Sequence, residues 1–147
     1  MAKFLSDEAG MDVRVQTYGG SGQSMPMIDA GRLDMQLIPS PDISAAVQGQ
    51  EQFEGRPLQN LRIVASLSSS AYGFMVREDS DHYKVSDIEG KSITYGYTAQ
   101  PTLRFQVDGI LAAGGLYIED METHMVPSVP NGVDDLIAGN VDVAFFS

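Results

Sequence analysis

Cysteine is absent from this sequence of 147 residues, which excludes disulfides, thiolate metal sites and a cysteine nucleophile. Basic residues are scarce, with 9 Lys and Arg against 20 Asp and Glu and a net charge of −11. Nucleic acids and anionic membranes bind basic faces, so we expect neither as a partner. Apolar runs stay well below the ~18 residues that cross a bilayer. Residues 1–10 are too acidic for a secretory signal.

Signatures of catalytic chemistry are also missing from the sequence. The two histidines, His82 and His124, lie far apart, and neither has a second histidine at the spacing of metal ligands. Ser21 stands in GGSG rather than in the G-x-S-x-G pattern of a nucleophile elbow, and no histidine base can be assigned to it. We therefore expect no enzyme activity, no metal ion and no cofactor.

Hydrophobic residues make up 43% of the chain, which is typical of a folded globular protein. Patterns of period two and of helical period alternate along it and predict an α/β fold. The expected strands are residues 13–17, 35–38, 61–67, 72–77, 91–96, 123–126 and 141–146. The expected helices are residues 2–9, 43–48, 85–89, 103–113 and 133–138, with one more that ends at Gly31. Asp42 is expected to cap the helix 43–48.

A short sequence pattern that occurs twice predicts two lobes. Residues 30–34, AGRLD, and residues 138–142, AGNVD, share one pattern: a helix end, glycine, a polar residue, an apolar residue and Asp before a strand. A charged turn at residues 78–81 separates the two halves in which these copies lie. We therefore expect a first lobe at residues 1–80 and a second lobe at residues 81–147.

Residues 19–22, Gly-Gly-Ser-Gly, form the first candidate binding motif. A glycine turn between a strand and a helix leaves backbone N–H groups bare beside the positive end of the helix dipole. It can hold a carboxylate, or it is only a tight connection between the two elements. Pro26 disfavours helix at the residue before it and can delay the helix start to residues 24–26. The candidate ligand contacts here are Gly20, Ser21 and Gly22.

Residues 96–102 form the corresponding loop of the second half. This region offers hydroxyl and amide donors, a threonine that can cap the next helix, and tyrosines whose rings suit a cleft wall. Arg104 follows in the first turn of the helix and can clamp a carboxylate through its guanidinium group. The alternative is a polar loop with an ordinary cap and a solvated arginine. The candidate ligand contacts are Tyr95, Tyr97, Thr98, Gln100, Thr102 and Arg104.

A series of short segments, in the same order along nearly the whole chain, resembles a known family. These segments are Tyr18-Gly19-Gly20-Ser21, Ala30-Gly31 with Asp34, Phe53-Glu54-Gly55, Asn60-Leu61-Arg62 with Ala65-Ser66-Leu67, Val76-Arg77-Glu78-Asp79-Ser80, Val85-Ser86-Asp87-Ile88-Glu89-Gly90-Lys91 and Gly139-Asn140-Val141-Asp142-Val143-Ala144-Phe145. They resemble the TAXI-type solute-binding receptors of TRAP transporters.

The resemblance implies a two-lobed architecture like that of type II periplasmic binding proteins. It implies an extracytoplasmic receptor, located in the periplasm, that closes on a small organic acid or amino acid and delivers it to TRAP membrane permease subunits. The solute is then expected between the turn at Gly20 and the loop 96–102. Compared with the family, the first lobe is incomplete and the second is largely present, so we expect this chain to be an internal fragment.

Two departures from the family pattern change the expected cleft. Where the family has a glycine-rich GSGT, this chain has Ala99-Gln100-Pro101-Thr102, which keeps the threonine and loses both glycines. At the rim, Ser40 is expected to contact the ligand, but prolines flank it on both sides.

An alternative to the receptor is a truncated fragment without a competent pocket, which self-associates as a homo-oligomer through its incomplete first lobe. An enzyme on the same fold is the least favoured reading.

Overall fold

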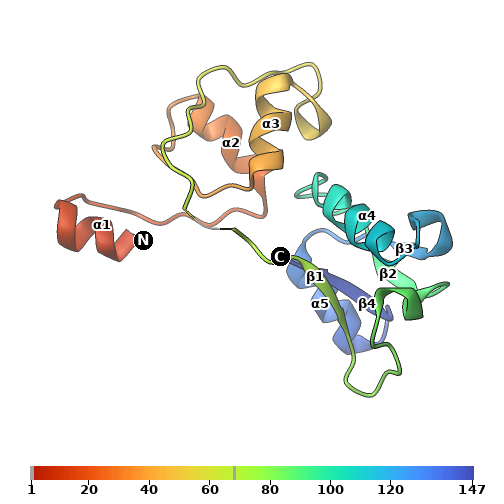
Figure 1. Ribbon diagram of the computed structural model, residues 1–147. Coiled ribbons are helices and arrows are strands. Elements are labelled where there is room, and N and C mark those ends of the chain that lie inside the picture. Colours follow the sequence, from red (N-terminus) through yellow and green to blue (C-terminus); the bar gives the residue numbers. More distant parts are fainter. Residues whose placement is uncertain (1, 68) are drawn as a thin grey trace.

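The computed structural model describes residues 2–67 and 69–147 and has a mixed α/β fold, which confirms the predicted fold class. Figure 1 labels the α-helices and the strands along the chain. The first half contains α1 (Ala2–Ala9), α2 (Ser21–Asp29), α3 (Ser40–Gln48) and the 3-10 helix η1 (Glu51–Phe53). The second half contains β1 (Gly73–Val76), η2 (Val85–Ile88), β2 (Ser92–Thr94), α4 (Leu103–Ala113), η3 (Ile118–Asp120), β3 (Glu122–His124), α5 (Val129–Ala138) and β4 (Val143–Phe146).

The four strands form one sheet in the order β1-β4-β2-β3. Strand β2 runs parallel to both β3 and β4, whereas β1 runs antiparallel to β4. The connection from β2 to β3 passes through α4, and the connection from β3 back across β2 to β4 passes through α5. The order of the strands therefore reverses at β2, and in such sheets a crevice opens at the carboxyl ends of the strands.

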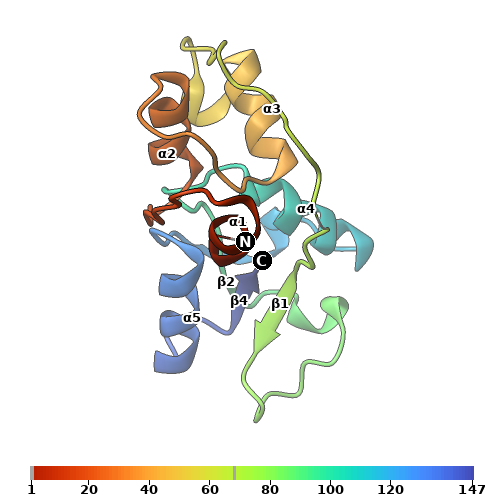
Figure 2. The ribbon, with the colours of Figure 1, turned by 90° about the vertical axis from the view of Figure 1, so that its left-hand side faces the viewer.

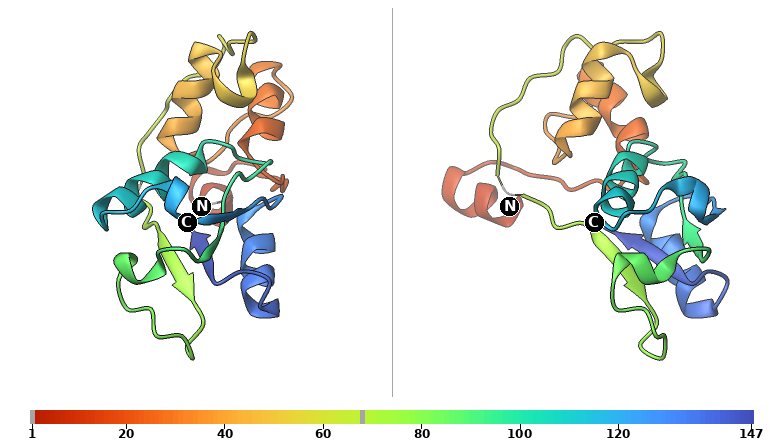
Figure 3. Two further views of the ribbon diagram at one scale, coloured as in Figure 1. Left: turned by 90° about the vertical axis from the view of Figure 1, so that its right-hand side faces the viewer. Right: turned by 45° about the vertical axis from the view of Figure 1, so that its right-hand side comes forward.

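Helices α4 and α5 cover opposite faces of the sheet, as Figures 2 and 3 show. Because side chains alternate along β4, Val143 and Phe145 pack into one core with Val107 of α4, whereas Ala144 packs with Leu136 of α5. We call residues 72–147 the sheet unit. Strand β1 belongs to this sheet although it precedes the lobe boundary expected after Ser80.

Helices α2 and α3 and the 3-10 helix η1 form a smaller body, which we call the helical unit (residues 20–58). It encloses a separate cluster of buried side chains: Met25, Ala45, Ala46, Phe53 and Leu58. Helix α2 begins at Ser21 and contains Pro26, so the delayed start considered above does not occur. Gly31 follows the end of this helix with φ of 68°, a left-handed conformation that suits glycine at a helix end.

The strands predicted at residues 13–17, 35–38 and 61–67 were wrong. None of these segments forms a strand in the structure, and their apolar side chains are largely exposed, with Val15 at 73% and Val64 at 90%. A strand needs a hydrogen-bonding neighbour, and within residues 2–67 and 69–147 none pairs with these segments. The alternating pattern therefore indicates which side chains of a segment share a face, but it does not indicate whether the segment pairs with another strand.

Helix α1 stands apart from both units and has no buried residue (Figure 1). In residues 2–67 and 69–147, no helix is both long enough and apolar enough to span a bilayer.

Candidate functional site

A crevice of about 270 Å³ opens at the carboxyl ends of β2 and β4. Its walls come from the loop after β2, the amino end of α5, the residue after β4, and Gly19 ahead of the helical unit. The lining residues are Gly19, Tyr97, Ala99, Gln100, Leu103, Ser128, Val129, Pro130 and Ser147. The location is the one that the reversal of strand order at β2 favours for a ligand.

Tyr97 gives the crevice a rigid, apolar wall. It is only 1% exposed, and its ring lies 6.0 Å from the ring of Phe145, between their centroids. Its hydroxyl lies 2.6 Å from Oγ1 of Thr94, which in turn accepts a hydrogen bond from the Phe145 amide at 3.0 Å. Burial raises the pKa of the Tyr97 phenol above its ordinary value, so this group stays neutral at physiological pH.

The amino end of α5 borders the crevice through Ser128, Val129 and Pro130. Ser128 precedes the helix with extended backbone, and Pro130 occupies a position of the first turn where its missing N–H costs nothing. The Ser128 hydroxyl donates to Oδ1 of Asn131 at 2.7 Å instead of capping the helix. Amides in the first turn of a helix have no intrahelical partner, and the helix dipole is positive there. This side of the crevice therefore favours an anionic group.

Gly20 and Ala99 bring the two predicted binding loops into contact. A Cβ atom built on Gly20 would lie 2.1 Å from the carbonyl oxygen of Ala99, closer than any side chain can approach. Only glycine permits this approach of the two backbones. The turn 19–22 and the loop 96–102 therefore touch at Gly20, so a solute cannot lie between them at this point, and only Gly19 of the turn lines the crevice.

Asp42 ties the helical unit to the sheet unit. Its side chain is 0% exposed, and its Oδ2 accepts a hydrogen bond from Nε2 of Gln100 at 2.8 Å. Its Oδ1 accepts a second hydrogen bond from the hydroxyl of Thr102. The expected role of Asp42 as the cap of α3 was wrong, because Pro39 occupies the cap position. Two of the donors that we assigned to a ligand are thus bound to a carboxylate of the protein itself.

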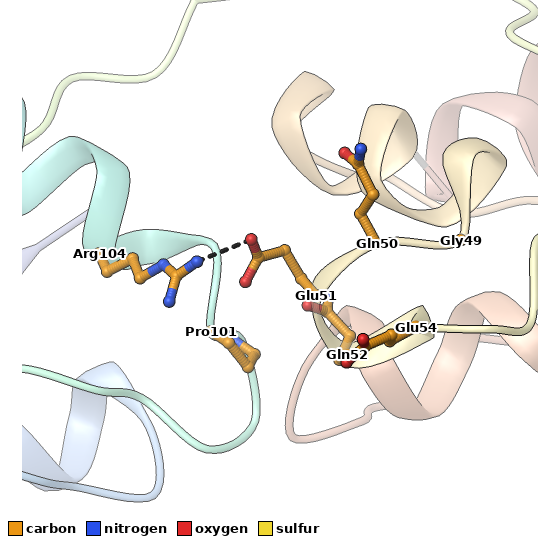
Figure 4. Close-up of a pocket in the computed structure, with 7 residues that line it drawn as sticks. All are labelled: Gly49, Gln50, Glu51, Gln52, Glu54, Pro101 and Arg104. Carbon is orange, nitrogen blue, oxygen red and sulfur yellow. Dashed lines mark hydrogen bonds and ion pairs between the residues drawn. The ribbon is translucent and has the colours of Figure 1, made fainter.

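Arg104 lies at a second and wider opening between the units, about 840 Å³ in volume (Figure 4). Its guanidinium donates to Oε1 of Glu51 at 2.7 Å, and its Cζ atom lies 5.0 Å from the ring centroid of Phe105. Glu51 has φ of 53°, an unusual value for a residue other than glycine. The lining residues are Gly49, Gln50, Glu51, Gln52, Glu54, Pro101 and Arg104. Arg104 therefore does not line the same cavity as Gln100.

The remaining predicted residues lie outside the crevice lining. Ser21 is buried and accepts from Nε2 of Gln52 at 3.4 Å, and Gly22 lies beside the same glutamine. Ser40 is exposed on α3. The Tyr95 hydroxyl donates to Oδ2 of Asp108 at 3.4 Å, and burial, with the Asp108 charge, raises the pKa of Tyr95. Thr98 is exposed and donates to the Pro127 carbonyl at 3.5 Å.

Sequence reasoning assigned Tyr97 and Gln100 to the site and missed the wall formed by residues 128–130. A usable signal was present, because Ser128 before Val129-Pro130 is a typical beginning of a helix. We instead expected a loop at residues 127–132 and a helix only from Val133. Among residues 2–67 and 69–147, no group of three His, Asp or Glu side chains is arranged to hold a metal ion.

Comparisons with known proteins give one family and several solved structures. The model of the NMT1-like family matches residues 1–147. No curated protein shows significant similarity to the chain.

Two of the similar structures are sulfonate-binding proteins, the first of them described as periplasmic. The aliphatic sulphonate binding protein SsuA from Escherichia coli aligns with 20% identity over 52% of this chain and 24% of its own, with a TM-score of 0.45. The alkanesulfonate-binding protein SsuA from Xanthomonas axonopodis pv. citri, bound to MOPS, aligns with 26% identity over 50% of this chain and 25% of its own, with a TM-score of 0.44. The chain thus spans about a quarter of these proteins.

Proposed function

Because the chain belongs to the NMT1-like family, we propose that it is part of an extracytoplasmic solute-binding receptor. The receptor captures a small organic acid or amino acid and delivers it to the permease subunits of a TRAP-type transporter. It works in the periplasm, and its role is binding rather than catalysis. The transporter type and the location rest on the resemblance of segments such as residues 85–91 to the TAXI-type receptors.

The observation that carries this proposal is the crevice at the carboxyl ends of β2 and β4. Its volume of about 270 Å³ suits a small solute. Tyr97 and Leu103 contribute apolar lining, and the amino end of α5 also borders the crevice. An apolar wall with a few convergent polar groups is the usual form of a small-molecule site. The positive end of the α5 dipole favours a carboxylate in this protein despite its net charge of −11.

A thermal-shift screen followed by titration calorimetry tests the proposal. The panel contains small carboxylates and amino acids, and a ligand at about 100 times its Kd should stabilise the fold by about 2.7 kcal/mol. Ser128→Trp fills the crevice and should abolish the shift. The matched control is Ser86→Trp, an exposed position just before β2 and hence at the opposite edge of the sheet, which should leave the shift unchanged. A shift that survives Ser128→Trp would place the ligand elsewhere and contradict the proposal.

The exposed apolar segments favour a second candidate, a self-associating module. Val15, Leu37 and Val64 are 73%, 64% and 90% exposed, and they lie in three segments that have strand-like alternation without a strand partner. Such segments invite pairing with another copy of the chain. Light scattering coupled to size-exclusion chromatography should then report a dimer or larger species, and Val64→Lys should reduce it. A chain that stays monomeric at high concentration would exclude this candidate.

A further inference from the structure

Carboxylates make the polar contacts between the helical unit and the sheet unit. The two units have separate apolar cores, and no buried side chain of the described residues belongs to both. The side-chain hydrogen bonds that cross between the units run from residues 100–104 to two acidic residues of the helical unit. Asp42 accepts from Gln100 and Thr102, and Glu51 accepts from Arg104. Three of the residues that we assigned to a ligand therefore bind acidic side chains of the protein itself.

Asp42 is buried without a neighbouring cation. Its side chain is fully buried, and no ion pair within residues 2–67 and 69–147 includes it. Two neutral donors stabilise its charge, together with the amino end of α3, in whose first turn Asp42 lies. A buried carboxylate is costly unless hydrogen bonds replace its lost hydration. Gln100 and Thr102 therefore have a definite task, which is to hold a negative charge away from water.

Gln100 and Thr102 approach the carboxylate as a pair. Nε2 of Gln100 donates to Oδ2 at 2.8 Å and the Thr102 hydroxyl donates to Oδ1, so each oxygen has its own donor. Thr102 precedes α4 but makes no capping hydrogen bond to it, and it is buried. Hydrogen bonds to a carboxylate are stronger than those to a neutral acceptor. Two side chains that converge on both oxygens of one carboxylate form a site for that group, whether it belongs to the protein or to a free anion.

We propose that Gln100 and Thr102 form an anion-binding site that Asp42 fills from within the protein, and that this internal anion latches the helical unit to the sheet unit. A free carboxylate reaches the site only when Asp42 leaves it, so the latch and the free anion exclude each other. The ion pair of Arg104 with Glu51 adds less, because the Arg104 side chain is 43% exposed. This site is independent of the proposed receptor function, since neither Asp42 nor Thr102 lines the crevice.

Chemical rescue with formate tests the anion site. Asp42→Ala removes the carboxylate and leaves its two donors beside a cavity that formate can fill. The variant should have a lower Tm than the wild type, and sodium formate should restore most of the difference. Sodium chloride at the same concentration should not restore it, and neither should formamide, a neutral molecule of similar size. Asp34→Ala makes the same change at an exposed position of the first half and should show no effect specific to formate.

The distance between the units tests the latch. The chain has no cysteine, so Gln48→Cys on α3 and Ala112→Cys on α4, both at exposed positions, accept a pair of fluorescent labels without further changes. Energy transfer between the labels should fall in Asp42→Ala and recover with formate. Thr102→Val removes one of the two donors and should abolish the effect of formate in the Asp42→Ala background.

A second variant keeps the test decisive if folding is lost. If circular dichroism shows that Asp42→Ala is unfolded in both chloride and formate, Asp42→Asn carries the measurement, because asparagine keeps the shape and loses the charge. Energy transfer should fall in this variant too, and formate should not restore it, since no cavity is present. If folded Asp42→Ala or Asp42→Asn keeps the wild-type energy transfer, Asp42 is not a latch. If formate restores folded Asp42→Ala no better than formamide does, the two donors are not an anion site. Either result would overturn the proposal.

Discussion

The sheet unit and the helical unit differ in how completely they bury their apolar side chains. In the sheet unit, four strands share their hydrogen bonds, and helices on both faces cover the side chains between them. In the helical unit, five buried residues form the core, while neighbouring segments leave valine and leucine side chains in solvent. Strands that pair in the sheet bury apolar side chains between the sheet and its helices, whereas the unpaired segments at residues 13–17, 35–38 and 61–67 leave most of theirs exposed.

The largest expected effect is the loss of unfolding free energy when one buried phenylalanine in each unit is replaced by alanine. Phe145→Ala removes a fully buried ring between α4 and the sheet and should cost about 3–5 kcal/mol of unfolding free energy. Phe53→Ala should cost about half as much, because its smaller cluster can collapse around the cavity.

Urea unfolding gives both values, and hydrogen exchange assigns each loss to its unit. Amides of β2 and β4 should be the best protected in the wild type. An equal cost for the two variants, or equal protection of α2 and β4, would show that the units have the same stability.

The contact between the units can be tested at one glycine. Gly20→Ala places a Cβ atom against the Ala99 carbonyl and should destabilise the protein by about 1–3 kcal/mol as the units shift apart. Gly109→Ala is the matched control, because nothing lies within 4 Å of its added Cβ on α4. It should stabilise the helix by about 0.5–1 kcal/mol. Thermal unfolding measures both, and a neutral Gly20→Ala would mean that the loops do not touch in solution.

A smaller effect is expected at the far end of the sheet, before β2 and β4. The Ser92 hydroxyl and amide donate to Oδ2 of Asp142 at 2.7 and 3.0 Å, and they lower the pKa of Asp142 below its ordinary 3.8. A lowered folded-state pKa contributes stability above pH 3.8 that is lost as the pH falls through the lowered value. Ser92→Ala should therefore have a lower Tm than the wild type near neutral pH. The difference in Tm between the two proteins should become smaller in acid. A difference that stays constant down to the lowest pH would contradict the assignment.

The sequence predicted the sheet unit more accurately than the helical unit. Helix α4 has the predicted bounds, and β1 and β4 lie within the expected strands. Periodicity succeeded there because each segment has the partner that its pattern requires. In the first half, residues 61–67 alternate well but have no strand beside them within the described chain. Alternation reports which side chains share a face, and it does not report whether another strand is near.

The candidate site shows the same limit. Tyr97 and Gln100 were identified from the polar loop that they belong to, and both line the crevice. Asp42 was assigned to its own helix, because a carboxylate beside a helix start is usually a cap. Its actual partners lie 58 and 60 residues away, and nothing local in the sequence indicates so distant a pairing.

By itself, the sequence determined the α/β class, the acidic character and one of the segments that line the crevice, the loop 96–102. These features depend on composition and on patterns within a few residues of one another. Only the tertiary structure decided which strands pair, that α5 forms a wall of the crevice, and that Asp42 takes the donors of Gln100 and Thr102. The physical reason is that hydrogen bonds and close contacts between distant segments depend on the path of the whole chain.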